Sequence, residues 1–106
     1  MQINQYVTIK VAEPWDFISP EGDNIFSGIV SDYTNSVDGE AFLIKNNRSF
    51  ILNGASVNYV VAMYRNKGID CKNLNIAYMQ DDIVKHFKEL DNVKDKLKFI
   101  IIGSLA

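Results

Sequence analysis

The fold is decided by residues 48–65, RSFILNGASVNYVVAMYR. Two apolar runs flank Asn53-Gly54, a dipeptide typical of two-residue type I′ turns because both residues tolerate a positive φ. The turn predicts an antiparallel hairpin with three direct pairs: Leu52 with Ala55, Phe50 with Val57, and Arg48 with Tyr59. Because side chains alternate along a strand, the hairpin places six of them on one face: Phe50, Leu52, Val57, Tyr59, Val61 and Met63.

The second arm of this hairpin is apolar on its other face as well, through Val60, Ala62 and Tyr64. Leu97–Ile102 is also apolar on both faces, and Ala41–Ile44 less fully. Strands of this kind lie in the centre of a sheet or are covered on both sides. We therefore expect either that the sheet curls into a barrel or that a second copy covers the exposed face.

Further strands are predicted on both sides of the hairpin, at residues 5–12, Ile25–Tyr33, Glu40–Lys45, Asn73–Met79 and Leu97–Ile102. Gly28 in the middle of a strand indicates a bulge or a close approach of two backbones. Asn46-Asn47 is predicted to form the turn that leads into the central hairpin.

The apolar period changes from two to about 3.6 after Met79, which predicts one helix. Its apolar stripe consists of Ile83, Val84, Phe87 and Leu90, and Asp81 and Asp82 precede the stripe, where a helix start favours negative charge. The predicted fold is therefore α+β: a small, mainly antiparallel sheet or partly open β-barrel of five to six strands, with this C-terminal-half helix packed on it.

The totals predict a single domain spanning residues 1–106. The net charge is −2 and the isoelectric point is near 5.2, which disfavours nucleic acid as a partner. One cysteine excludes an intramolecular disulfide, and neither a signal peptide nor a membrane-spanning apolar stretch is visible. We expect a cytoplasmic protein without membrane contact.

The sequence offers no motif for catalysis. His86 is the only histidine and Cys71 the only cysteine, so a multi-histidine metal site is excluded. A dyad of these two residues lacks any supporting pattern, and a helix-flank His and a structural thiol are the simpler interpretations. Asp16, Glu21 and Asp23 lack the spacing of a calcium loop. We therefore expect no catalytic residue, no metal and no cofactor.

The candidate binding residues are Trp15, Tyr33, Arg48, Tyr64 and Arg65. Trp15 follows Pro14 in a bend, where it either plugs one end of a barrel or lines a groove. Arg48 and Arg65 are the only arginines, and their planar side chains suit a carboxylate or phosphate. The simpler interpretation is that the strand aromatics belong to the core and that the arginines are surface charges.

These observations favour a small non-catalytic binding module that self-associates as a homo-oligomer or presents loops to a protein partner. The expected loops are Trp15–Asn24, Thr34–Gly39 and Asn66–Lys72. The alternative is a protein that binds a small polar ligand in an aromatic pocket, with Asn or Arg side chains fixing it. A single-stranded nucleic-acid binder and an enzyme of unrecognised type rank below these two.

Overall fold

The computed structural model describes residues 1–12, 17–37, 39–52, 54–65, 68–73, 87–93 and 100–105. These residues form seven strands and one helical turn: β1 (Tyr6–Val11), β2 (Phe17–Ile18), β3 (Ile25–Ser36), β4 (Gly39–Leu52), β5 (Ala55–Arg65), β6 (Gly68–Asn73), α2 (Leu90–Val93) and β7 (Ile100–Leu105).

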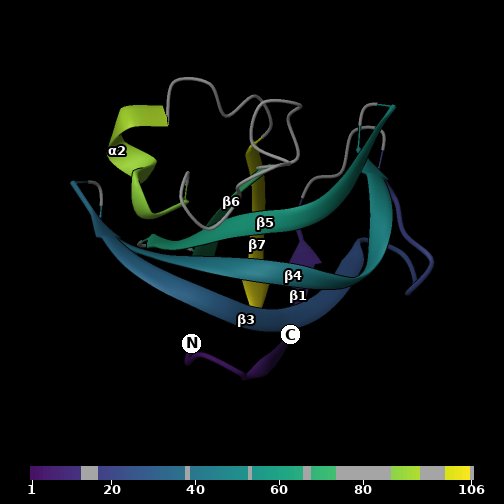
Figure 1. Ribbon diagram of the computed structural model, residues 1–106. Helices are drawn as coiled ribbons and strands as arrows, with labels where there is room; N and C mark the ends of the chain where they lie inside the picture. Colours follow the sequence, from purple (N-terminus) through teal and green to yellow (C-terminus); the bar gives the residue numbers. More distant parts are fainter. Residues whose placement is uncertain are drawn as a thin grey trace.

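The strands form one antiparallel sheet in the order β2-β4-β3-β1-β7-β6-β5, and β4 pairs additionally with β5. Following the pairings from β1 through β3, β4, β5, β6 and β7 therefore leads back to β1. The long strands β3, β4 and β5 lie side by side and bend in the same direction (Figure 1). The result is a strongly curled, barrel-like sheet.

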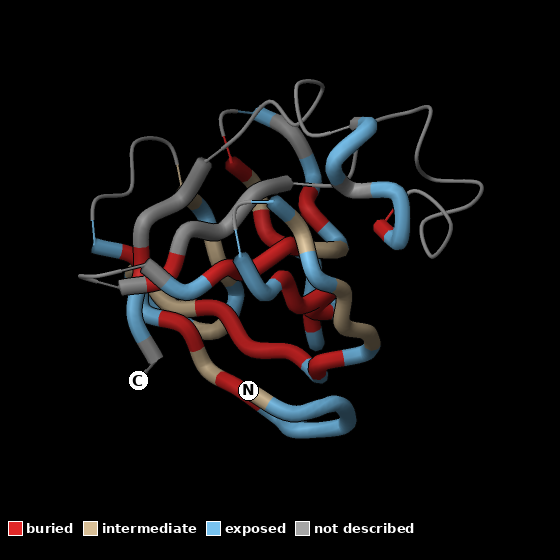
Figure 2. Tube along the Cα trace, turned by 90° about the vertical axis from the view of Figure 1, so that its left-hand side faces the viewer, coloured by how far each residue is buried: buried red, intermediate tan, exposed pale blue. Residues whose placement is uncertain are grey.

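The inner face of this sheet forms the core. Thirteen buried side chains make up one cluster: Val7, Ile9, Val11, Phe26, Val30, Phe42, Ile44, Phe50, Leu52, Val57, Val60, Ala62 and Ile69. The buried stretches gather in the middle of the molecule, with exposed stretches around them (Figure 2). Met1, Phe17 and Tyr33 are partly buried against the cluster.

The α+β fold class, with five to six strands and a helix packed on the sheet, is wrong. The sheet has seven strands, and in the described part of the chain helical backbone is limited to Phe87–Lys88 and the single turn of α2. Of the predicted stripe, Ile83 and Val84 lie outside the described residues. Phe87 is buried as predicted, with 0% of its surface exposed. A spacing of apolar residues reports which side chains need cover, but it does not require a regular helix to provide that cover.

The predicted hairpin is confirmed next to its turn and wrong farther from it. Gly54 has a φ of 80°, and Leu52 pairs with Ala55 and Phe50 with Val57, whereas Asn53 lies outside the described residues. Tyr59 pairs with Lys45 instead of Arg48, because the register shifts between Lys45 and Phe50.

This register shift also overturns the predicted common face. Phe50, Leu52 and Val57 belong to the core cluster, but the next core residues on β5 are Val60 and Ala62. Tyr59, Val61 and Met63 therefore lie on the outer face, since a shift of one residue exchanges the two faces of a strand.

The predicted turn at Asn46-Asn47 is also wrong, because β4 runs without interruption from Gly39 to Leu52. Asn46 pairs with Gly28 of β3, where an added Cβ would lie 2.3 Å from the carbonyl oxygen of Lys45. The close backbone approach that Gly28 predicts is thus confirmed. The Asn46 Nδ2 donates to the Val57 carbonyl at 3.0 Å, which satisfies a backbone acceptor beside the register shift.

Candidate functional site

Two surfaces of the sheet gather tyrosine side chains, and the first lies at one end of the inner face. Tyr33 pairs directly with Phe42, and Asn35 pairs with Glu40. Tyr64 lies two residues beyond Ala62, the partner of Phe42. Alternation therefore directs all five side chains to the inner face at the same end of the curled sheet. We call this group, Tyr33, Asn35, Glu40, Phe42 and Tyr64, the barrel mouth.

The three aromatic rings of the barrel mouth are in contact. The ring centroids of Tyr33 and Phe42 are 5.2 Å apart, and the Phe42 and Tyr64 rings meet edge to face with centroids 6.1 Å apart. Phe42 is buried, whereas Tyr64 is 46% exposed. The three rings therefore form a continuous aromatic cluster that extends from the buried core to the solvent.

The polar groups of the barrel mouth are joined through one phenol. The Tyr33 hydroxyl donates to Asn35 Oδ1 at 2.8 Å and to Glu40 Oε1 at 3.3 Å. Partial burial raises the pKa of Tyr33 above its ordinary value, and the nearby Glu40 carboxylate raises that pKa further. Ionisation of Tyr33 is disfavoured because it would place a second negative charge beside the Glu40 carboxylate, so the Tyr33 hydroxyl is held as a hydrogen-bond donor.

A hollow of about 400 Å³ opens at the barrel mouth, lined by Met1, Gln2, Ile3, Tyr33, Glu40 and Phe42. The first residues are held there by backbone bonds on both sides of Val30, from Asn4 N to Val30 O at 2.7 Å and from Val30 N to Gln5 O at 2.9 Å. The Met1 ammonium donates to the Tyr64 hydroxyl at 2.9 Å. The rim thus holds a positively charged nitrogen beside an aromatic residue.

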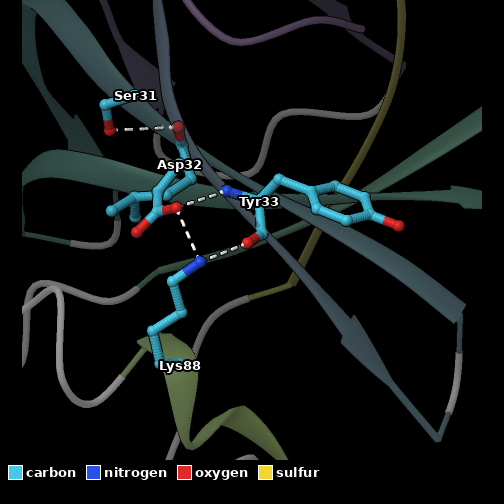
Figure 3. A network of polar contacts seen from close by, with 5 residues as sticks. Ser31, Asp32, Tyr33 and Lys88 are labelled. Atoms are coloured by element: carbon cyan, nitrogen blue, oxygen red, sulfur yellow. Dashed lines mark hydrogen bonds and ion pairs between the residues drawn. The ribbon is translucent and has the colours of Figure 1, made fainter.

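Tyr33 is fixed from the opposite side of β3 by Lys88. Its Nζ lies 2.8 Å from Asp32 Oδ1 and donates to the Tyr33 carbonyl at 2.6 Å. Asp32 Oδ1 also accepts from the Tyr33 backbone N–H at 2.8 Å. The Tyr33 ring points away from this network (Figure 3). Since the β3 register shifts between Val30 and Asp32, these contacts set where the displaced backbone places the ring.

The second surface lies on the outer face. Four residues are direct cross-strand partners in succession: Tyr6 with Ile29, Ile29 with Lys45, and Lys45 with Tyr59. They form one line across β1, β3, β4 and β5, which we call the outer row. Tyr6 is 57% exposed and Ile29 48% exposed. Two large apolar side chains therefore lie side by side in solvent.

The same outer face is covered beside the row. Ala41, Leu43, Val61 and Met63 are all buried, although none belongs to the inner core cluster. Leu43 pairs with Asp32, the residue that binds Lys88, and Phe87 is buried next to Lys88 in the sequence. Lys88 is thus bound beside this half of the face through Asp32, while Tyr6 and Ile29 of the outer row stay exposed.

A smaller hollow of about 240 Å³ adjoins the outer row and is lined by Ile29, Lys45, Asn46 and Asn47. Asn46 is buried, and its Oδ1 has no hydrogen-bond partner in the part of the chain that the structure describes. The outer row therefore lies next to Asn46 Oδ1, a buried acceptor at the β4 register shift that has no hydrogen-bond partner among the described residues.

Of the five predicted binding residues, the structure brings Tyr33 and Tyr64 together. Arg48 is exposed on β4 beyond the register shift, so it does not join them. Trp15 lies outside the described residues, and Arg65 belongs to β5 but its side chain is not among those described. The grouping of these tyrosines with Trp15 and Arg65 stays a prediction.

The sequence analysis missed Glu40 and Phe42 as parts of a site, although a usable signal was present. A short connection near Gly39 makes residues equally far from it cross-strand partners, which predicts Tyr33 opposite Phe42 and Asn35 opposite Glu40. The outer row carries no comparable signal, because the line from Lys45 to Tyr59 depends on the register shift.

The described residues include no group of three His, Cys, Asp or Glu side chains placed to hold a metal ion. His86 lies outside the described residues, and the Cys71 side chain is not described. Within the described chain, no helix has the length and apolar character needed to cross a membrane.

No protein-family model matches this chain, and neither a curated protein nor a solved structure shows significant similarity to it.

Proposed function

We propose that the chain is a non-catalytic binding module that associates with a second copy of itself through the outer row. The observation that carries the proposal is the exposure of Tyr6 and Ile29 as direct cross-strand partners. Adjacent large apolar side chains on a soluble domain favour an interaction surface.

The arrangement of the sheet favours a face over an edge as the contact. Because the pairings from β1 lead back to β1, the described strands β1 and β3 to β7 each have a neighbour on two sides along part of their length. Extension of the sheet into a second copy needs an unpaired edge. Association through the outer row needs no unpaired edge, because the exposed side chains of the row make the contact.

The outer row is complementary to the outer row of a second copy whose residues run in the opposite order. A two-fold axis parallel to the strands sets Tyr6 against Tyr59 of the second copy, and Ile29 against Lys45 of the second copy. This order separates the two Lys45 ammonium groups and lays each lysine stem on an isoleucine. A row of one cation among apolar groups, on a chain of net charge −2, offers little to a phosphate backbone.

The test is sedimentation velocity over a dilution series of the wild type, of Ile29→Lys and of Ile18→Lys. Ile18 is a matched control, because it is an isoleucine in a strand and 60% exposed but does not belong to the outer row. We expect the wild type and Ile18→Lys to dimerise and Ile29→Lys to be monomeric. A wild type that is monomeric at every concentration would refute self-association, and equal effects of both substitutions would refute the outer row as its site.

A further inference from the structure

We propose that the barrel mouth binds a methylated organic ammonium group. This site is separate from the outer row, and the two proposals stand or fall independently. The shared chemistry is a positively charged nitrogen carrying methyl groups, presented either by a free small molecule or by a modified lysine side chain of another protein.

The shape of the barrel mouth suits a small group. The hollow of about 400 Å³ is open to solvent, and small-molecule sites occur at the mouths of β-barrels. Its floor is the aromatic pair Tyr33 and Phe42, and its other walls include the aliphatic side chains of Met1 and Ile3. Such walls favour methyl groups over a fully hydrated ion.

The charge of the barrel mouth sets the sign of the ligand. Glu40 is the charged side chain among the described lining residues, and Arg48 is not one of them. Aromatic faces attract a cation because the ring quadrupole is negative above its plane. The Glu40 carboxylate and the two lining rings of Tyr33 and Phe42 therefore favour a cation over the anionic ligand that the arginines would suit.

The polar groups at the hollow are distributed so that the carboxylate faces the aromatic lining. The Met1 nitrogen donates to the Tyr64 hydroxyl at the rim, whereas the Glu40 carboxylate accepts from Tyr33. A methylated ammonium bound in the hollow would contact the lining rings of Tyr33 and Phe42 and the carboxylate of Glu40.

The experiment is a choline titration followed by ¹H–¹⁵N spectra, with 3,3-dimethylbutan-1-ol as the uncharged isostere. A second arm uses a short peptide containing trimethyllysine and the same peptide with unmodified lysine. We expect saturable shifts at the barrel mouth with choline or with the trimethyllysine peptide, and weaker binding of the uncharged isostere and of the unmodified peptide. The stronger of the two binding arms identifies the source of the ammonium group.

Two substitutions test the residues. Glu40→Gln keeps an acceptor for Tyr33 and removes the charge, so we expect an affinity about five- to tenfold lower. Tyr33→Leu removes a lining ring and should weaken binding roughly two- to thirtyfold. Asp23→Asn, an exposed loop carboxylate, is the control and should leave the affinity unchanged.

Three outcomes of these titrations would overturn the proposal. Absence of saturable shifts with both cations, at concentrations that would saturate a millimolar site, overturns the proposal. Equal binding of choline and its uncharged isostere, or an unchanged affinity in Glu40→Gln, also overturns it. Well-dispersed spectra for each variant establish that a loss of binding is not a loss of folding.

Discussion

The barrel mouth and the outer row both present two tyrosines, yet their surroundings differ. Tyr33 and Tyr64 adjoin a buried phenylalanine and a carboxylate around a hollow. Tyr6 and Tyr59 end a line that crosses the outer face through Ile29 and Lys45. An open hollow offers a site for a small group, whereas an exposed outer face offers a site for another surface. The comparison shows that strand register, more than residue type, decides which surroundings a tyrosine side chain has.

The register of β4 connects the two surfaces. Phe42 and Glu40 point into the barrel mouth, and Lys45 points into the outer row, because they differ by an odd number of positions along one strand. On β5, Tyr64 and Tyr59 are likewise divided between the surfaces. A change that moves β4 against β5 is therefore expected to disturb both sites, and a change confined to one face only one.

The largest expected effect comes from the covered part of the outer face. Phe87→Ala should lower the free energy of unfolding by about 3–5 kcal/mol, because it removes a fully buried ring. Tyr6→Ala, in the exposed row, should cost less than about 1 kcal/mol. Denaturant melts of both variants provide the measurement. A Phe87→Ala curve that superimposes on the wild-type curve would show that this half of the face does not depend on Phe87.

A change at the hairpin turn tests the coupling of the two surfaces. Gly54 has a φ of 80°, which a β-branched residue resists, so Gly54→Val should destabilise the fold by about 1 kcal/mol or more. Because β4 and β5 carry residues of both surfaces, dimerisation and choline binding should weaken together. Thermal melts, sedimentation and choline titration of this variant test that expectation, and an unchanged melting temperature would argue against the turn.

A change at the β3 register shift should affect the barrel mouth alone. Lys88→Met removes the contacts to Asp32 and to the Tyr33 carbonyl, at a cost of about 1 kcal/mol for a half-exposed pair. Choline affinity should fall because the Tyr33 ring is less well fixed, while the dimer dissociation constant stays the same. Lys10→Met, at an exposed β1 lysine, is the control. Equal loss of dimerisation in Lys88→Met would mean that the surfaces are not independent.

The smallest expected effect concerns the pKa of Tyr33. This pKa is raised in the folded protein, so the neutral phenol is favoured there and the unfolded chain ionises first. The contribution of Tyr33 to stability is therefore complete below its unfolded pKa of about 10 and is lost as the pH rises through the folded value.

The substitution Glu40→Gln should lower the pKa of Tyr33 in the folded protein. The difference in phenolate absorbance between the wild type and Tyr33→Phe measures it, and a midpoint at or below the ordinary value would contradict the assigned contacts.

What the sequence predicted correctly is local. The turn at Gly54 and the pairs next to it depend on a few adjacent residues, and the close approach at Gly28 depends on the lack of one Cβ. The place of Phe87 in an apolar stripe predicts its burial. In each case the physical cause lies within the residues that were inspected.

What the sequence missed depends on contacts between distant segments. At the register shift that moves Tyr59 opposite Lys45, the Asn46 side chain donates a hydrogen bond to the Val57 carbonyl. No local sequence pattern predicts this bond. Tyr33, Tyr64 and Arg48 were candidates together, and the structure places Arg48 apart from the two tyrosines, because the position of a side chain along a strand does not reveal which end of the sheet it reaches. The predicted packed helix is not supported in the described part of the chain, where helical backbone is limited to Phe87–Lys88 and α2, and most of the predicted helix lies outside the described residues.

The central claim is that the two surfaces bind different partners independently. One series of ¹H–¹⁵N spectra, recorded over a range of protein concentrations with and without choline, tests it directly. Dilution is predicted to shift the resonances of Tyr6, Ile29, Lys45 and Tyr59, and choline those of Tyr33, Glu40, Phe42 and Tyr64. Shifts of the same resonances in both experiments, or of neither set, would contradict the claim.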